Sequence, residues 1–323
     1  MKRARNEIYD KTKKTCLIIG QDGWDLDVLI NLTFFYNELG FRVTIAREPM
    51  PTDLLVIQRF CPNGNISTHM LSPNTPIHIF PYVGYSPEPL LRHLNKFPVS
   101  IFAPSENLMA KNGFVYQTVM FPPVYVPFWK RKIRSSRYKF VHIGNLKKIE
   151  NNSIWPEWSE LVQALQAKNA HVWGKGWGKY NVATWHGKLL LSKVPHIYAQ
   201  TKYALGLMYP YQVRMKTISG RFWQAPLCGA AVICEKNINV QIPGIFPIGF
   251  SCLNNDNLLK NLIPDRYDIQ LAATEFWENQ WNDCKKKVRE SLLRAPALEG
   301  HSLPIASAIF AFILLIKEGI IYA

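Results

Sequence analysis

Residues 203–234 read YALGLMYPYQVRMKTISGRFWQAPLCGAAVIC. A small apolar run at 204–208 predicts a short buried strand, and a second apolar run follows at 230–233. Between them lie a basic loop and a helical pattern over 217–227, which Gly229 ends. Strand, cationic loop, helix and strand is the order in which an α/β sheet binds an anion near the carboxyl ends of its strands. The stretch therefore predicts a parallel-sheet domain with a binding site for a diphosphate.

The loop and the first helical turn carry three fixed positive charges, Arg214, Lys216 and Arg221. Backbone N–H groups at the start of the predicted helix would add to their field. We expect these side chains to surround the anion.

The segment Gly220 to Ala230, GRFWQAPLCGA, resembles the R-x-F-E-A-x-x-C-G-A segment of GT-B glycosyltransferases. It is most similar to the CgeB/YkvP-like group and more distantly to family 4 enzymes. In these enzymes the segment lies in a C-terminal Rossmann-like domain and holds the nucleotide of a sugar donor. The resemblance implies an α/β GT-B fold, in which two Rossmann-like parallel-sheet domains face a cleft. It also implies transfer of a sugar from a nucleotide-sugar donor to a glycan or lipid-linked acceptor.

Two positions depart from the family pattern. Gln224 stands where the family has the glutamate that binds the ribose, and Lys216 stands where family 4 enzymes often have a second glutamate. A catalytically inactive GT-B scaffold therefore stays an alternative interpretation.

Composition and charge limit the class of protein. The chain has 323 residues and a formal net charge of +15, so two domains and an anionic partner are expected. The positive charge gathers in three blocks, at 2–14, 130–139 and 285–289. The blocks favour peripheral docking on an anionic membrane, and they keep a nucleic-acid-binding protein as an alternative. Against that alternative, no recognised nucleic-acid module is present.

Cysteine usage and hydropathy bear on where the protein works. The six cysteines lack the C-x-x-C spacing of metal sites, and scattered thiols in apolar runs suggest a reducing compartment. No apolar segment of a signal peptide follows the charged N-terminus. The apolar run 303–316 is short for a bilayer span. We expect a cytoplasmic protein.

The hydrophobic pattern predicts two α/β domains. Strands are expected at 15–19, 41–45, 53–58, 76–80, 98–103, 117–120, 138–144 and 170–174, besides the two named above. Helices are expected at 28–39, 156–167, 196–202, 255–261 and 275–293. A proline-rich connector at 121–127 places the boundary, giving an N-terminal acceptor domain at 1–129 and a C-terminal nucleotide-sugar domain at 130–300. A C-terminal helix within 301–323 could pack back on the N-terminal domain.

The loops that follow the strands nominate further donor-binding residues. Besides the three cations above and Gln224, these are Gly144, Lys147, Lys148 and Lys175. Basic groups would stabilise the charge that grows on the leaving diphosphate, so we expect neither a metal nor a cofactor beyond the nucleotide sugar. A surface role is the competing interpretation for each lysine alone.

Three residues are candidates for the catalytic base. Asp22 and Asp25 follow the first predicted strand, where GT-B acceptor loops lie and where Asp27 also stands, and His78 lies on a later predicted strand. An N-cap role for either aspartate, and a core role for His78, are the competing interpretations.

Overall fold

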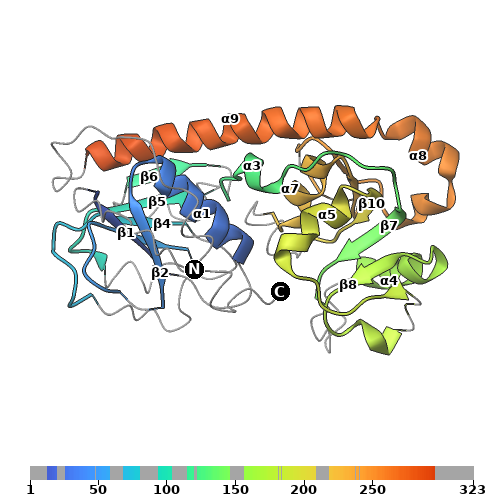
Figure 1. Cartoon of the computed structure of the whole chain (residues 1–323), viewed down its shortest axis with the longest axis horizontal. Helices are drawn as coiled ribbons and strands as arrows, with labels where there is room; N and C mark the ends of the chain where they lie inside the picture. Colours follow the sequence, from blue (N-terminus) through green and yellow to red (C-terminus); the bar gives the residue numbers. More distant parts are fainter. Residues whose placement is uncertain are drawn as a thin grey trace, which may run out of the picture.

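The computed structural model describes residues 13–19, 26–47, 49–58, 68–80, 94–103, 115–119, 122–145, 156–180, 182, 184–208, 218–236, 238–239 and 241–294. It shows two α/β domains side by side, each built on a parallel sheet (Figure 1). This confirms the predicted fold class, because both sheets have helices beside them and a cleft lies between the domains.

The N-terminal sheet has the strand order β2-β1-β3-β4-β5-β6. Its strands are β1 (Thr15–Ile19), β2 (Arg42–Ala46), β3 (Leu54–Ile57), β4 (Ile77–Ile79), β5 (Val99–Ala103) and β6 (Val115–Thr118). The central strands β3, β4 and β5 are buried along their whole length, as expected of parallel strands covered on both faces. Helix α1 (Leu26–Glu38) packs its apolar side chains on one face of this sheet.

The C-terminal sheet has the strand order β12-β11-β10-β7-β8-β9. Its strands are β7 (Tyr138–Ile143), β8 (His171–Trp173), β9 (Thr184–Trp185), β10 (Thr201–Leu205), β11 (Ala231–Ile233) and β12 (Ile245–Phe246). The helices of this half are α3 (Val126–Trp129), α4 (Pro156–Ala167), α5 (Val194–Tyr198), α7 (Arg221–Gln224) and α8 (Asp256–Leu262). Four 3-10 turns accompany them, η3 (Trp177–Tyr180), η4 (Leu191–Lys193), η5 (Pro226–Cys228) and η6 (Phe250–Asn254).

The predicted helix over 217–227 is wrong in extent. The α-helical part is the single turn α7, and η5 continues it to Gly229, which has a φ of 76°. Pro226 has no backbone N–H and its ring crowds the preceding turn, so the α-helix ends before it. A dipole from one turn adds little, which leaves the charge of Arg221 as the main attraction for an anion here.

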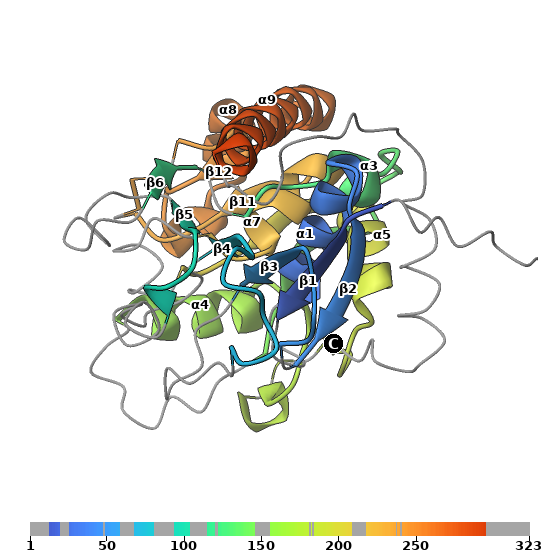
Figure 2. The ribbon, with the colours of Figure 1, turned by 90° about the vertical axis from the view of Figure 1, so that its left-hand side faces the viewer.

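Helix α9 (Arg266–Leu293) runs along both domains (Figure 1). Viewed along the long axis of the molecule, it lies to one side of the sheets (Figure 2). The Arg266 guanidinium at its start donates to the carbonyl oxygens of Gly229, Ala199 and Arg134, at 2.8–2.9 Å. These bonds fix the start of α9 to the C-terminal domain.

The far end of α9 belongs to the core of the N-terminal domain. Trp281, Cys284 and Val288 are buried there, and the indole Nε1 of Trp281 donates to Glu38 at 3.0 Å. Helix α9 thus begins earlier than the predicted helix at 275–293 and runs from the C-terminal domain to the N-terminal one. The predicted helix within 301–323 lies outside the described residues.

None of the described helices has the length and hydropathy that crossing a membrane requires. The five described cysteines are buried free thiols, and Cys61 lies outside the described residues.

Candidate functional site

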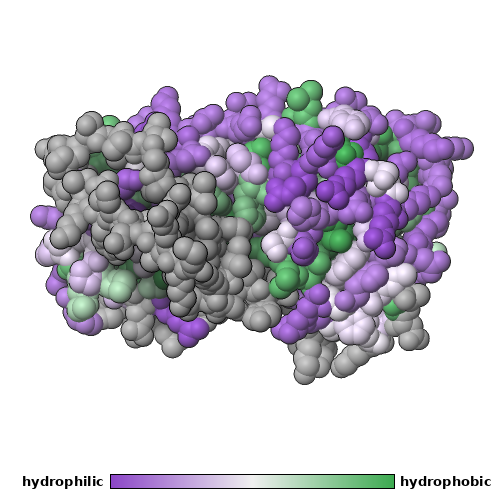
Figure 3. Space-filling view, viewed as in Figure 1, coloured by the Kyte–Doolittle hydropathy of each residue, from purple (hydrophilic) through white to green (hydrophobic). Residues whose placement is uncertain are grey.

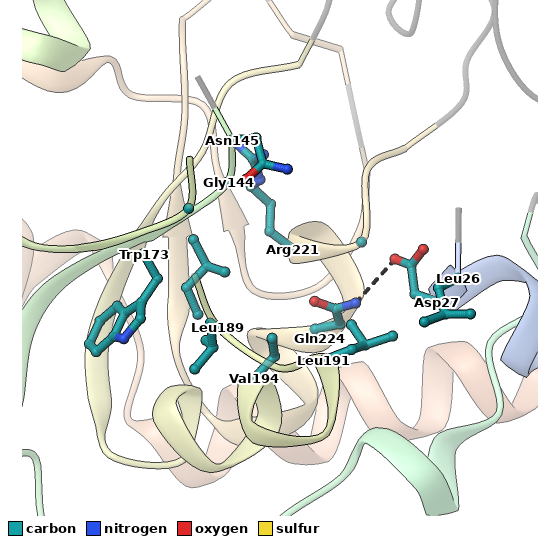
Figure 4. A pocket seen from close by; sticks show the side chains of 13 residues that line it. Leu26, Asp27, Gly144, Asn145, Trp173, Leu189, Leu191, Val194, Arg221 and Gln224 are labelled. Carbon is teal, nitrogen blue, oxygen red and sulfur yellow. Dashed lines mark hydrogen bonds between the residues drawn. The ribbon is translucent and has the colours of Figure 1, made fainter. Parts of the chain in front are cut away.

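A cleft between the domains collects the carboxyl ends of β7 and β8, and α7 borders it (Figure 4). Two of its lining residues, Leu26 and Asp27, come from the start of α1 in the N-terminal domain. The others belong to the C-terminal domain and are Ile143, Gly144, Asn145, Trp173, Gly174, Leu189, Leu191, Val194, Gly220, Arg221 and Gln224. The motif that resembles GT-B enzymes therefore lies in the wall of an interdomain cleft.

Two glycines make room for the Arg221 side chain. A Cβ atom on Gly206 would lie 2.9 Å from Arg221 Cδ, and one on Gly144 would lie 2.7 Å from Arg221 Nη2. The side chain therefore reaches from α7 past the end of β10 to the end of β7, as Figure 4 shows. Its guanidinium lies at the carboxyl edge of the sheet, where parallel α/β domains bind ligands.

The Arg221 guanidinium makes no hydrogen bond and no ion pair with any residue that the structure describes. A partly buried cation without a partner is costly, and a bound anion would remove that cost. A cation in this position is what a binding site for a phosphate group requires.

His142 is buried near Arg221, directly before the lining residues Ile143 and Gly144. Burial, and next the charge of Arg221, lowers the pKa of His142 to about 3, so the ring is neutral at pH 7. Its Nδ1 lies 2.8 Å from the carbonyl oxygen of Leu205, and a carbonyl only accepts, so Nδ1 carries the proton. The Nε2 atom, which approaches Gly144, is then an acceptor.

The loops after β7 and β8 are tied together. Gly144 N donates to the Trp173 carbonyl at 2.9 Å, and the indole Nε1 of Trp177 donates to the Gly144 carbonyl at 2.7 Å. Asn145 Oδ1 accepts from the backbone N–H of Lys175 at 2.8 Å. These bonds hold the loop backbone in place before any ligand binds.

A hydrogen bond between Gln224 and Asp27 joins the two domains at the opposite wall. Gln224 Nε2 donates to Asp27 Oδ2 at 3.1 Å, and Asp27 Oδ1 accepts from the N–H of Val28 at 3.0 Å. A Cβ atom on Gly220 would lie 2.1 Å from Asp27 Oδ2, so only glycine admits the carboxylate here. Asp27 is the one carboxylate among the described residues that line the cleft.

The sequence-predicted site residues divide into three groups. Gly144, Arg221 and Gln224 line the cleft together, and Lys175 is exposed beside the lining residue Gly174. The remaining donor and base candidates, except His78, lie outside the described residues: Asp22, Asp25, Lys147, Lys148, Arg214 and Lys216.

His78 does not reach the cleft, so its proposed role as a base is wrong. Its side chain is 1% exposed, and burial lowers its pKa to about 3. The Tyr36 hydroxyl lies 2.8 Å from Nδ1 and Ser291 Oγ lies 3.4 Å from Nε2, so α1 and α9 enclose the ring. The competing interpretation of a core histidine holds.

His142 was not predicted near the site, whereas Asp27 and Asn145 lie in the two segments, each after the first strand of a domain, that the sequence nominated. Asn145 directly follows the nominated Gly144, and its side-chain amide next to a glycine turn was an available signal. Asp27 opens α1, yet its sequence neighbours do not show that it faces α7. His142 lies between Val141 and Ile143 in the apolar run of β7, which is indistinguishable from a core position.

The described residues hold no group of three or more His, Cys, Asp or Glu side chains placed to bind a metal ion.

Residues 155–266 match the model of a family described as glycosyl transferase-like. The matched range contains α7, the β8 loop and most of the C-terminal wall of the cleft. No curated protein matches the chain.

Solved glycosyltransferases have a similar fold. A DNA-modifying β-glucosyltransferase, solved with and without uridine diphosphoglucose, gives a TM-score of 0.53 at 13% identity, covering 85% of this chain and 99% of that one. A glycosyltransferase from Rickettsia africae ESF-5 gives 0.52 at 11% identity, covering 88% and 100%. Anabaena HepE, in complex with UDP and glucose, gives 0.50 at 10% identity, covering 87% and 99%. The likeness extends over both domains, which confirms the GT-B fold; the narrower CgeB/YkvP-like and family 4 assignments stay predictions.

Proposed function

We propose that this GT-B glycosyltransferase moves a sugar from a nucleotide-sugar donor to a hydroxyl group of a glycan or lipid-linked acceptor. The observation that carries the proposal is the Arg221 guanidinium at the carboxyl edge of the C-terminal sheet, which pairs with none of the residues that the structure describes. Two of the similar structures were solved with UDP or a UDP-sugar, which supports a nucleotide diphosphate as the anion.

Arg221 stabilises the leaving diphosphate. Negative charge grows on the phosphate as the glycosidic bond breaks, and a fixed cation already in place stabilises that charge without reorganisation. His142 is neutral and Nδ1-protonated, so it adds no competing positive charge beside Arg221. Lys175 at the rim adds a second cation, and Lys147, Lys148, Arg214 and Lys216 stay predictions for the same role.

Gln224 contacts the ribose of the donor through its amide. In the ligand-free arrangement this amide donates to Asp27. A donor that takes over the amide would release Asp27 from Gln224, so donor binding and the availability of the carboxylate are coupled through one side chain.

Asp27 activates the acceptor. It comes from the domain opposite Arg221, and it is the carboxylate that the described cleft offers. A carboxylate within hydrogen-bond reach of an acceptor hydroxyl can remove its proton as the oxygen attacks the sugar.

No metal is required in this proposal, because Arg221 and its neighbours neutralise the phosphates. Asp25 and Asp27 nevertheless stand two residues apart in the sequence, and two carboxylates can share a divalent cation. Turnover measured with EDTA and with added Mg²⁺ tests this part of the proposal separately; loss of turnover in EDTA, restored by Mg²⁺, would contradict it.

The donor site is tested by thermal denaturation of the wild type, Arg221→Ala and Arg289→Ala with UDP, GDP, CMP and dTDP. A nucleotide at 100 times its Kd stabilises the fold by about 2.7 kcal/mol. We expect one nucleotide to raise the Tm of the wild type and of Arg289→Ala, an exposed arginine far along α9, but not that of Arg221→Ala. No response from the wild type would favour the inactive scaffold.

The base is tested with Asp27→Asn, which keeps the shape and one acceptor oxygen. We expect hydrolysis of the matching nucleotide sugar, followed by release of the nucleotide, to fall by roughly 10²–10⁴-fold. The Tm shift by the nucleotide alone should be unchanged. An unaltered rate would remove Asp27 from the mechanism.

A further inference from the structure

A cluster of cations lies on the outer side of the chain segment whose inner side lines the cleft. It contains Arg131 and Arg134 from the linker after α3, and Lys193 from η4, and these three cations lie around His196 of α5. We call the three cations the linker cation cluster. The linker and α5 are held together by the hydrogen bond from Arg134 N to the Ala199 carbonyl, at 3.0 Å.

The cluster is not neutralised within the part of the chain that the structure describes. The Arg131 guanidinium donates only to the backbone carbonyls of Phe128 and Lys130, and none of the three cations makes an ion pair with a described carboxylate. The pKa of His196 is lowered, first by partial burial and then by the charges of Arg131, Lys193 and Arg134. The three cations therefore lie near enough to His196 to disfavour its protonated form, and an external anion would relieve the repulsion among them.

The same segment presents an apolar side chain beside the cluster. Leu190 is 44% exposed and accepts, through its carbonyl, the N–H of Lys193 at 2.9 Å. Its neighbours Leu189, Leu191 and Val194 line the cleft instead. Figure 3, seen from the same side as Figure 1, shows hydrophilic side chains next to a hydrophobic strip over the region of α5. One turn of chain thus separates the cleft from a surface that is both basic and apolar.

We propose that this surface docks on an anionic phospholipid bilayer, with the linker cation cluster on the phosphate headgroups and Leu190 in the interfacial layer. Basic side chains near an anionic membrane are attracted to its surface potential, and an exposed leucine gains by leaving water there. A soluble polyanion would satisfy the cations and make no use of Leu190, so the combination favours a bilayer.

The inference goes beyond the proposed function and fits the lipid-linked choice of acceptor within it. A bilayer on the outer side of the segment 189–196 would bring a lipid-borne hydroxyl to the rim of the cleft. Docking itself requires no catalysis, so it can be tested whether or not the enzyme turns over.

The test is co-sedimentation of the full chain with vesicles of phosphatidylcholine alone, or mixed equally with phosphatidylglycerol. We expect binding to the mixed vesicles only, weakening as salt is raised. Each cation near the surface contributes about fivefold in partitioning, so Arg134→Gln/Lys193→Gln should lose roughly 25-fold. Leu190→Asn should lose binding to a smaller extent.

The matched control is Lys260→Gln/Lys286→Gln, which removes the same charge from exposed positions on α8 and α9. Equal loss in this control would overturn the proposal in favour of general charge attraction. Binding to heparin that equals vesicle binding, with Leu190→Asn unchanged, would overturn it in favour of a soluble polyanion. The nucleotide-induced Tm shift, measured on every variant, shows that the variants are folded and keeps this result separate from the donor site.

Discussion

The two domains each bury a histidine in a parallel strand, and the two histidines have different uses. His78 on β4 and His142 on β7 both have a pKa lowered to about 3, with burial as the main cause. Both rings are therefore neutral at pH 7. The two histidines differ in the residues that pack against each strand.

His78 is closed in on its remaining sides by α1 and α9. Tyr36 and Ser291 contact its two ring nitrogens, and Phe102 packs edge-on at 5.0 Å between centroids. His142 has one nitrogen on a backbone carbonyl and the other beside Arg221 at the cleft. A neutral buried histidine is thus structural where two helices enclose it, and it lies next to a site where its neighbours Ile143 and Gly144 line a cleft.

The largest expected effect tests the closed side of this comparison. Phe102→Ala removes a fully buried ring that packs on His78 and Phe80, and the cavity should lower the free energy of unfolding by about 3–5 kcal/mol. The increase in the free energy of unfolding produced by the nucleotide should keep its size, because the cleft is untouched. Urea denaturation with and without nucleotide measures both; loss of the nucleotide response would show that the two regions are not independent.

The pH dependence of stability should reveal both histidines. Their folded pKa of about 3 lies below the ordinary value of 6.5, so protons bind the unfolded chain first. Their contribution is complete above pH 6.5 and is lost as pH falls toward 3. At pH 5 each should lower the free energy of unfolding by roughly 2 kcal/mol.

This expectation is checked by urea denaturation at pH 7 and pH 5 on the wild type, His78→Gln and His142→Gln. In each variant, the difference in the free energy of unfolding between pH 7 and pH 5 should fall to about half of its wild-type value. If a variant showed the same difference in the free energy of unfolding between pH 7 and pH 5 as the wild type, the replaced histidine would be solvated in the folded protein.

A smaller expected effect tests the open side. In Gly144→Ala the new Cβ meets Arg221 Nη2, the mobile end of a side chain, so stability should change by less than about 1 kcal/mol. The displaced guanidinium should weaken nucleotide binding by roughly tenfold, or about 1.4 kcal/mol.

Gly178→Ala is the matched control for that measurement. There the new Cβ would lie 2.9 Å from Trp185, a similar crowding of a side chain outside the residues that line the cleft. Equal nucleotide affinities in the two variants, measured by calorimetry, would argue against the role of Arg221.

The smallest expected effect concerns the contact between α9 and His78. Ser291→Ala removes the α9 hydroxyl that donates to Ser100 and lies 3.4 Å from His78. A loss of about 0.5–1.5 kcal/mol in the free energy of unfolding is expected. The turnover should not change. An altered turnover would show that α9 affects the cleft as well as the packing around His78.

Much of this architecture could be predicted from hydrophobic periodicity. The apolar runs that became β1, β3, β5 and β7, and the helix 156–167, were expected within about two residues. Element boundaries failed where chemistry beyond periodicity intervened. Pro226 shortened the motif helix, and the polar anchor at Arg266 started α9 earlier than its apolar spacing suggested.

The candidate site was predictable only in part. Arg221, Gln224 and Gly144 followed from the motif and from the glycine that ends a strand. The contact of Asp27 with Gln224 could not be predicted, because it joins residues 197 positions apart. The use of His78 could not be decided either, because the helix that covers it lies more than 200 positions further along the chain.

The sequence by itself determined that this chain forms two parallel-sheet domains with a cationic, nucleotide-type motif in the second. Strands, helices and turns depend on neighbouring residues, and that information is local. Only the tertiary structure decided which glycines admit Arg221 and Asp27, which buried histidine borders the cleft, and which cations from separate segments share one surface. These outcomes depend on the packing of distant segments, and no periodicity within one segment encodes what will lie against it.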